Sequence, residues 1–361
     1  MGSAQQCIGA AIGVMMDAAD EGAGSRTGRA VWFEAVRTAV VKEEAVASPR
    51  SDQVTIQSTV SLISPGTEMQ VYRGQISPDT DLGLETCAGS FGFPVKYAYQ
   101  VVGRVVEVGK DVPLRAGELV FARHPHQDLF TMRYNPDLVF RLPPDMDPEV
   151  AVFANLADVA LNALLDVPVR IGDVVTVFGQ GIVGLFCTLF ASKTAGHLIV
   201  VDPVAARRRR GAEYGADRAV HPDEAAQAVL DATGGRGADV AIEVSGAPPA
   251  LQQAIAVTGQ EGVIVAVSYY GSRPVTLTLA PEFHFRRQRI VSSQVSSVGS
   301  GLQTRWSFSR RMETVLSLLS NAAARVMISH RLPLRAAPRA YELLDTNPDE
   351  ALGVILQHRD A

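Results

Sequence analysis

The stretch "VFGQGIVG", Val177 to Gly184, decides the fold of this chain. It follows the short apolar segment "DVVTV" and begins an apolar helical segment that ends with Gly196, so a G-x-G-x-x-G pattern joins a strand to a helix. In such a loop the first glycine permits a tight turn, the second admits a pyrophosphate to the backbone, and the third lets the helix pack on the strand. The helix N-terminus attracts the phosphate charge. The sequence therefore predicts a dinucleotide site at Gly179, Gln180, Gly181, Ile182, Val183 and Gly184.

The expected partner of this loop is an acid at the end of the next strand. The segment "LIVVD" ends at Asp202, 23 positions after Gly179, close to the spacing of about 20 expected for a ribose-binding carboxylate. Such a carboxylate accepts hydrogen bonds from ribose hydroxyls and repels a 2′-phosphate, which favours NAD. The run "RRRR" follows, and its first member, Arg207, is assigned to the cofactor site. NADP remains the alternative because these arginines can pair with a phosphate, although the solvated face of a helix explains them as well.

Two patterns divide the 361 residues. Residues 30–150 alternate apolar and polar positions, as in "VTIQSTVSLI", or are rich in valine, as in "YQVVGRVVEVG", with Gly and Pro in the turns between them. From about Val150, continuous apolar strands such as "DVAIEVSG" alternate with helix-length segments. This alternation is typical of a doubly wound parallel sheet. The predicted fold class is α/β, with a β-rich domain and a dinucleotide-binding domain.

Composition excludes several classes of protein. The net charge is −5 and the only basic run is "RRRR", so we expect no nucleic-acid partner. Three widely separated cysteines form neither a metal knuckle nor a disulfide framework, which favours a reducing, cytoplasmic compartment. The apolar run Ile8–Met16 is too short to span a membrane. Residues 1–29 are expected to form a mobile arm, with a signal peptide as the alternative.

The order of these parts resembles the medium-chain dehydrogenase/reductase superfamily, in particular its zinc-type alcohol, sorbitol and threonine dehydrogenases. The likeness covers nearly all of residues 30–358 and lies mainly in "ISPGTEMQVYRG", "VVGRVVEVG", "GELVFA", "VFGQGIVG" and "LPLRAAPRAYELL". It implies a GroES-like β-rich catalytic domain (30–157 and 298–361), a Rossmann domain (158–297), and an active site in the cleft between them. It also implies a small-molecule substrate and a homodimer.

The positions that hold zinc in the resembled family carry other residues here. Pro65 stands in place of the first ligand, a cysteine, Tyr99 in place of the second, a histidine, and Ala154 lies nearest the third. Proline and alanine offer no donor atom, and a neutral tyrosine is a poor zinc ligand. Three cysteines cannot form the four-cysteine structural zinc lobe. The comparison predicts a member without zinc, which calls the usual Lewis-acid mechanism into question.

Two histidines in "FARHPHQ" are the next candidates. By the resemblance, His124 falls at a position that lines the substrate pocket. A replacement metal site at His124 and His126 is an alternative, because residues i and i+2 of a strand share a face, but two imidazoles make a poor site and Pro125 disturbs the strand. We expect no metal, a catalytic or substrate-contacting role for His124, and a structural role for His126.

The remaining candidates for proton transfer come from the vacated zinc region. Thr67 matches the hydroxyl residue that relays the proton in relatives, and turn capping is its alternative. Tyr99 can donate a hydrogen bond to the substrate oxygen, or simply fill the metal space. Asp158 stands where relatives have a threonine beside the nicotinamide, and it acts either as a base or as a group that caps or pairs locally. We predict that Thr67, Tyr99, His124 and Asp158 surround the substrate oxygen, with His124 or Asp158 as the acid/base; Glu68 and Lys96 are expected to be structural.

The predicted function is zinc-independent hydride transfer between nicotinamide and a secondary alcohol or ketone. The polar groups of the pocket and "HFRRQR" (284–289) favour a cyclitol, sugar-like or secondary-metabolite substrate. Two alternatives stay open. One is an NADPH-dependent ene or quinone reductase of the zinc-free branch, against which "GQGIVG" with Asp202 argues. The other is a protein that binds NAD(H) without turnover.

Overall fold

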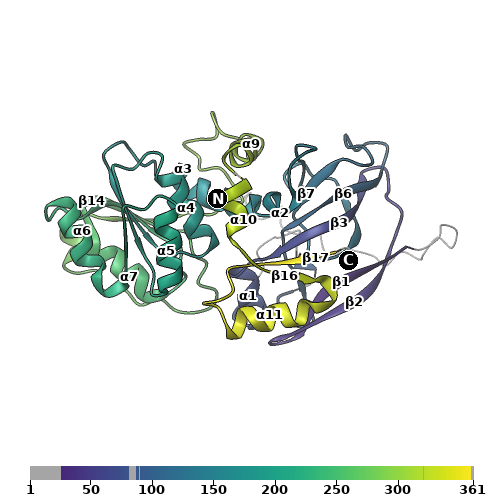
Figure 1. Ribbon diagram of the computed structural model, residues 1–361, viewed down its shortest axis with the longest axis horizontal. Helices are drawn as coiled ribbons and strands as arrows, with labels where there is room; N and C mark the ends of the chain where they lie inside the picture. Colours follow the sequence, from purple (N-terminus) through teal and green to yellow (C-terminus); the bar gives the residue numbers. More distant parts are fainter. Residues whose placement is uncertain (1–25, 81–86, 89, 320, 359–361) are drawn as a thin grey trace, which may run out of the picture.

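The computed structural model describes residues 26–80, 87–88, 90–319 and 321–358. Two bodies lie side by side, each built around its own β-sheet (Figure 1). The fold class predicted from the sequence is confirmed: one sheet is parallel, the other is largely antiparallel.

The parallel sheet has six strands in the order β12-β11-β10-β13-β14-β15. Every neighbouring pair is parallel, and β10 lies between β11 and β13, where the direction of winding reverses. In sheets of this kind a ligand binds outside the carboxyl ends of the strands at this point of reversal. The strands are β10 (Val174–Phe178), β11 (His197–Val201), β12 (Arg218–Val220), β13 (Ala238–Glu243), β14 (Thr258–Ala266) and β15 (Arg289–Ser292).

Helices and short helical turns connect these parallel strands. β10 is a run of five buried residues, as expected for a strand that is covered on both faces. The connecting elements are α4 (Ile182–Ala191), α5 (Ala205–Glu213), the 3-10 helix Pro222–Glu224, α6 (Ala225–Thr233), α7 (Pro248–Val257) and α8 (Glu282–Phe285).

The second sheet has the order β16-β17-β3-β6-β7-β9, with β8 paired to β3. Its pairs are antiparallel except β16 and β17, which are parallel. A separate hairpin, β1 (Arg26–Ala35) and β2 (Thr38–Val46), lies along one side, and β4 (Cys87–Ala88) pairs with β5 (Lys96–Tyr97). The strands are β3 (Gln53–Ile63), β6 (Val101–Val108), β7 (Leu119–Ala122), β8 (Leu129–Arg133), β9 (Val139–Arg141), β16 (Ile328–Pro333) and β17 (Gly353–Gln357).

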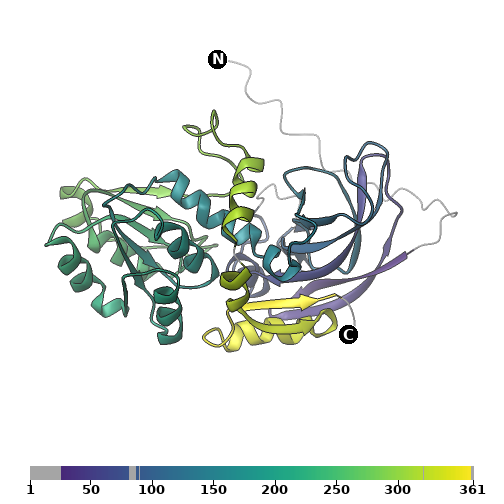
Figure 2. The ribbon, with the colours of Figure 1, turned by 45° about the horizontal axis from the view of Figure 1, so that its top comes forward.

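Helices from distant parts of the sequence lie between and beside the two sheets. Figures 1 and 2 both show α3, α9 and α10 at the junction, and α11 beside the strands of the second body. These helices are α1 (Thr67–Tyr72), α2 (Pro148–Ala151), α3 (Ala154–Asp166), α9 (Phe308–Leu318), α10 (Asn321–Val326) and α11 (Ala337–Thr346), the last preceded by the 3-10 helix Leu334–Ala336.

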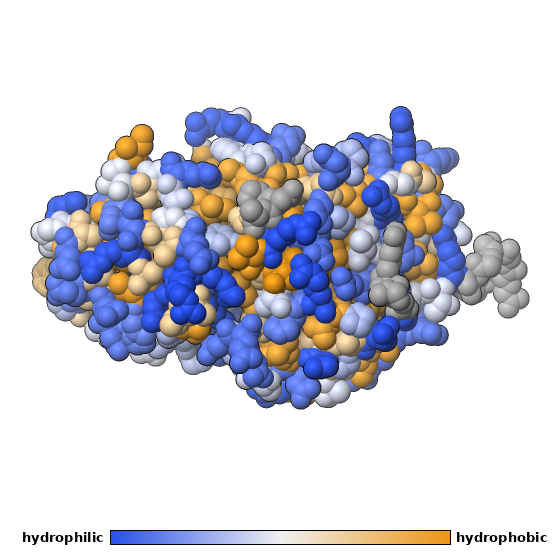
Figure 3. Space-filling view, viewed as in Figure 1, coloured by the Kyte–Doolittle hydropathy of each residue, from blue (hydrophilic) through white to orange (hydrophobic). Residues whose placement is uncertain are grey.

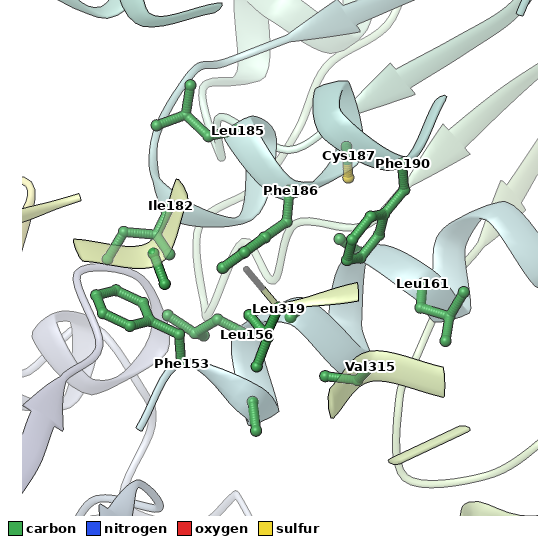
Figure 4. Close-up of a cluster of buried hydrophobic side chains, with 14 of the residues drawn as sticks. Phe153, Leu156, Leu161, Ile182, Leu185, Phe186, Cys187, Phe190, Val315 and Leu319 are labelled. Carbon is green, nitrogen blue, oxygen red and sulfur yellow. The ribbon is translucent and has the colours of Figure 1, made fainter. Parts of the chain in front are cut away.

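One hydrophobic cluster joins the helices at this junction. Phe153 and Leu156 from the start of α3 face Ile182 and Phe186 of α4, and Leu319 closes the cluster from the end of α9 (Figure 4). All five side chains are almost completely buried. Because α4 begins at the dinucleotide loop, this packing fixes the loop relative to α3.

Three expectations from the sequence need correction. Residues 26–29, assigned to the arm, belong to strand β1, where they pair with β2; residues 1–25 lie outside the described residues. Helix α3 crosses the expected domain boundary between residues 157 and 158, because one continuous apolar face packs on α4. Helix α4 ends at Ala191, before the expected stop at Gly196. The reason for that glycine is a close approach: a Cβ there would lie 2.6 Å from the Cα of Gly172.

The surface fits the composition. Figure 3 shows hydrophilic residues interspersed with hydrophobic ones over the face that it presents. Within the described residues, no helix is long and apolar enough to cross a membrane.

Candidate active site

The glycines of the loop after β10 have the geometry that their spacing predicts. Gly179 has φ +98°, and a Cβ there would lie 2.8 Å from Ser245. A Cβ on Gly184 would lie 2.0 Å from the carbonyl oxygen of Gly179, so helix α4 can approach the strand only with glycine at this position. Around Gly181, in contrast, no described atom lies within 4 Å of such a Cβ. The open backbone at the N-terminus of α4 fits a dinucleotide diphosphate.

The three side chains between the glycines of this loop are buried or partly buried. Ile182 is buried beside Phe153 (Figure 4), and Val183 is partly buried. Gln180 is fully buried: its Nε2 donates to the carbonyl oxygen of Gly179 at 2.9 Å, and its Oε1 accepts from Thr188 at 3.1 Å. These three side chains therefore pack beneath the loop, so a ligand contacts mainly the backbone of the loop.

Asp202 lies at the end of β11 with 3% of its surface exposed. Its Oδ2 accepts from the amide of Gln180 at 2.7 Å, and its Oδ1 accepts from the amide of Val204 at 2.8 Å. A carboxylate has about four lone-pair sites, so two such bonds leave capacity for ribose hydroxyls. The contacts tie the acid directly to the glycine loop.

Two of the four arginines after Asp202 already donate to carbonyl oxygens. Arg207 donates to the carbonyl oxygen of Pro348, and Arg208 donates to the carbonyl oxygens of Asp202 and Pro203 at 2.8 Å each. A guanidinium that already holds a carbonyl is less available for a 2′-phosphate. The geometry therefore agrees with the charge argument for NAD.

A second acid, which lies at the carboxyl ends of the parallel strands, was not identified from the sequence. Glu243 ends β13 and is fully buried; its Oε1 accepts from the amide and hydroxyl of Ser245 at 2.8 and 2.6 Å. Its Oε2 accepts from the hydroxyl of Tyr270 at 2.5 Å, and burial together with this carboxylate raises the pKa of Tyr270. The signal was present in "EVSG", an acid that ends a buried strand next to the reversal point. Glu243 shapes the loop that faces Gly179.

Tyr99 and Thr67 come together at the start of α1. The Tyr99 hydroxyl lies 2.7 Å from the Ser64 hydroxyl, and the Thr67 side chain is close enough to lower the pKa of Tyr99. Burial raises the pKa of Tyr99 to about 12, although both hydroxyl contacts lower it. Tyr99 is therefore a neutral phenol and a hydrogen-bond donor at neutral pH. Ser64, which the sequence analysis did not single out, completes a group of three hydroxyls.

Glu68 and His126 form a separate buried network. His126 Nε2 lies 2.9 Å from Glu68 Oε1, and both side chains are at most 1% exposed. Tyr341 of α11 donates to the same oxygen, and the Ser64 amide donates to Oε2 at 2.9 Å. The structural roles predicted for Glu68 and His126 agree with these contacts. Lys96, also predicted to be structural, pairs with Glu44 at 2.8 Å.

His124 faces different partners. Its ring stacks on Phe130, with centroids 3.7 Å apart and planes inclined by 6°. Nδ1 lies 2.8 Å from the carbonyl oxygen of Pro125, which can only accept, so Nδ1 carries the proton and Nε2 the lone pair. Burial, with Lys96 nearby, lowers the pKa of His124 to about 3. The imidazole is thus neutral, an acceptor at Nε2.

Asp158 is completely buried between two arginines. Arg311 of α9 meets it in a fork, with Nε–Oδ1 at 2.9 Å and Nη2–Oδ2 at 3.0 Å, whereas Arg123 reaches Oδ2 at 3.4 Å. Burial raises the pKa of Asp158, and both guanidiniums oppose that shift. These contacts are those of the ion-pair alternative. The four predicted catalytic residues therefore divide into three sets: Thr67 with Tyr99, His124 with Pro125, and Asp158 with the arginines.

Pro65, Tyr99 and Ala154, the residues that the resemblance matches to the family's zinc positions, are poorly suited to hold a zinc ion. Pro65 and Ala154 have no donor atom, and Ala154 is fully buried in the hydrophobic cluster. The hydroxyl of Tyr99 is bound to Ser64, and the nearby carboxylate of Glu68 is bound to His126 and Tyr341. In the part of the chain that the structure describes, no three His, Cys, Asp or Glu side chains gather in a way that could hold a metal.

Comparisons with known proteins agree with this architecture. A family model described as zinc-binding dehydrogenase matches residues 183–321. A D-guloside 3-dehydrogenase of Shigella flexneri is 30% identical over 260 residues, which cover 70% of this chain and 74% of that protein. A 2-desacetyl-2-hydroxyethyl bacteriochlorophyllide A dehydrogenase of Cereibacter sphaeroides is 26% identical over 329 residues, covering 86% of this chain and 92% of that protein.

The fold also matches solved structures. An alcohol dehydrogenase from Thermus sp. ATN1 superposes with a TM-score of 0.73 at 24% identity, covering 92% of this chain and all of the other. At this level of identity the match shows a common fold.

Proposed function

Because this chain belongs to the medium-chain zinc-binding dehydrogenase superfamily, and is therefore an NAD(P)-dependent dehydrogenase of CH–OH groups, we propose that it works without zinc and prefers NAD(H). The observation that supports this most strongly is the engagement of Glu68, whose carboxylate is committed to His126 and Tyr341. The resemblance adds that Pro65, Tyr99 and Ala154 match the zinc positions, where two of the three have no donor atom. A buried acid with those partners is satisfied without a metal.

The proposed NAD(H) site consists of the glycine loop and Asp202. Gly181 presents open backbone, and Asp202 is fixed by the amides of Gln180 and Val204. When bound, the nicotinamide supplies the carbon that accepts or delivers the hydride. The protein's share is to hold the dinucleotide against the substrate and to move the hydroxyl proton.

We propose that Tyr99 and His124 together handle the hydroxyl proton of the substrate. Tyr99, a neutral phenol whose single proton lies toward the Ser64 hydroxyl, turns that proton to the substrate oxygen, and the Ser64 hydroxyl then donates to the phenol oxygen in its place. His124, whose Nε2 carries a lone pair, accepts a hydrogen bond from the substrate hydroxyl and passes the released proton on to solvent, because its pKa of about 3 means that it cannot retain the proton at neutral pH. Asp158 is less suited to that task because its buried carboxylate is already paired with Arg311. Its role is to fix the two arginines.

The substrate that we propose is a polar secondary alcohol, such as the ring hydroxyl of a sugar or cyclitol. The relative from Shigella flexneri is named for oxidation at position 3 of a guloside, which is a secondary alcohol of this kind. The three hydroxyls of Ser64, Thr67 and Tyr99 offer matching hydrogen-bond partners. We also propose a homodimer in a reducing, cytoplasmic compartment, consistent with the scattered cysteines.

A panel assay tests this function. The full chain, dialysed against a chelator, is incubated with NAD or NADP and a series of alditols, cyclitols and methyl glycosides, and NADH formation is followed by absorbance. We expect NAD-linked oxidation that survives chelation. Turnover confined to NADPH with an enone would establish the alternative reductase, and tight NADH binding with no turnover on either panel would establish the non-catalytic alternative.

A further inference from the structure

One guanidinium at the junction has hydrogen-bonding capacity that the protein does not use. Arg123 directly follows β7 and precedes His124, and its only side-chain hydrogen bond within the described residues is the 3.4 Å contact with Asp158. Its Nε is buried and has no hydrogen-bond partner in the described part of the chain. The backbone amide of Arg123 donates a hydrogen bond to the carbonyl oxygen of Leu138 at 2.8 Å, which holds the backbone in place.

The contacts of the neighbouring Arg311 explain why Arg123 has hydrogen-bond donors without acceptors. Arg311 donates to Asp158 Oδ2 at 3.0 Å, its Nε lies 2.9 Å from Oδ1 without forming a hydrogen bond, and it also donates to Asn162 Oδ1 at 2.7 Å and to the Val295 oxygen at 2.6 Å. The charge of Asp158 is thus paired mainly with Arg311, at shorter distances than the 3.4 Å to Arg123. Asp137, the other acid that interacts electrostatically with Arg123, is exposed and forms no hydrogen bond with it in the described residues. A buried donor without a partner costs about 1–3 kcal/mol, a cost that a bound acceptor would remove.

Aromatic rings hold Arg123 in position. Its guanidinium carbon lies 4.6 Å from the centroid of Phe308, whose ring packs on Phe140 at 6.1 Å, and Phe140 stacks on Phe121 at 5.0 Å. A guanidinium stacked on a ring keeps its N–H edge free for in-plane acceptors. The side chain as a whole retains 13% exposure although its Nε is buried, so a ligand reaches the guanidinium from its Nη side.

We propose that Arg123 binds a carboxylate of the substrate, and thus that the preferred substrate is a hydroxy acid such as a sugar acid. This inference rests on the proposed function and makes its substrate class narrower. A planar carboxylate matches the N–H edge of one guanidinium. A phosphate dianion is less suitable, because Asp158 lies 3.4 Å from the same guanidinium and the second cation, Arg311, is already paired.

The test compares three six-carbon ligands that differ only in the group at C1: D-glucitol, D-gluconate and D-glucitol 1-phosphate. Binding to the full chain is measured by calorimetry, with and without saturating NADH. We expect gluconate to bind at least about tenfold more tightly than glucitol, as one charged hydrogen bond predicts. The variant Arg123→Met removes this preference, and Arg123→Lys, which keeps the charge but not the planar edge, retains only part of it.

Arg133→Met is the matched control, because Arg133 is an exposed arginine of the same sheet that pairs with Asp52, and it leaves the preference intact. Equal binding of gluconate and glucitol, or a preference that survives in Arg123→Met, overturns the inference. Tighter binding of the phosphate ester than of gluconate also overturns the inference. If Arg123→Met does not fold, as judged by circular dichroism, Arg123→Lys decides. NAD-linked oxidation of neutral alcohols does not depend on this site, so its presence or absence reports on the proposed function alone.

Discussion

Removing Arg311 tests the buried ion pair that joins α3 to α9. In Arg311→Met, Asp158 keeps only the 3.4 Å contact with Arg123, while the Asn162 oxygen and the carbonyl of Val295 lose their donor. Because both members of the pair are at most 1% exposed, solvent cannot replace these contacts. Breaking a buried pair from one side costs about 3–5 kcal/mol. With a urea m-value of about 3 kcal/mol/M, the unfolding midpoint falls by roughly 1–2 M.

Urea unfolding followed by circular dichroism measures this shift. A double variant tests whether the unpaired charge of Asp158 is its cause. Replacing the whole pair, in Arg311→Met with Asp158→Leu, removes the unpaired charge, so we expect most of the lost stability to return. Arg133→Met, which breaks an exposed pair, should cost at most about 1 kcal/mol. A loss below about 1 kcal/mol in Arg311→Met, or a double variant no more stable than the single one, would refute the ion-pair reasoning.

Three further predictions concern the loop, the proton donor and pH. Gly184→Ala places a Cβ 2.0 Å from the Gly179 oxygen, so NADH affinity measured by fluorescence should fall more than about tenfold, whereas unchanged affinity would contradict the close packing. Tyr99→Phe removes the proposed donor, so kcat should fall about 10²-fold or more with NADH affinity unchanged; an undiminished kcat would exclude Tyr99 from the chemistry. Burial lowers the pKa of His358 to about 3, so the folded state binds fewer protons than the unfolded state, and stability is lost as pH falls from about 6.5 to 3. His358→Gln should flatten that loss by up to about 1.4 kcal/mol per pH unit in urea titrations at pH 6, 5 and 4, and an unchanged slope would contradict the buried neutral histidine.

The sequence was most informative where the physics is local. The three glycines and Asp202 follow from strand, turn and helix chemistry within about 25 residues, and the structure places each as the pattern requires. Similarly, continuous apolar segments predicted parallel strands because burial on both faces leaves no room for alternation.

The candidate catalytic residues depended on contacts that no local pattern encodes. Asp158 meets Arg311, 153 positions away, so the sequence could offer only a choice between base and ion-pair partner. Glu68 meets Tyr341 across a similar separation, 273 positions. For the same reason Arg123 and Glu243 were not singled out: an arginine or a glutamate becomes informative only when its partners, or the lack of them, are known.

The boundary errors have a different cause. The start of β1 at Arg26 and the continuity of α3 across residue 157 are set by pairing with β2 and by packing on α4. Propensity alone does not place such ends, because tertiary contacts extend or shorten an element by several residues.

The measurement that tests the central claim most directly is the zinc content of the active protein. The full chain is purified without added metal, its NAD-linked oxidation of a polar alcohol is measured, and zinc is quantified by elemental analysis relative to chain concentration. The account predicts zinc near background in protein that turns over. About one zinc per chain, with activity lost on chelation and regained on adding zinc, would contradict it.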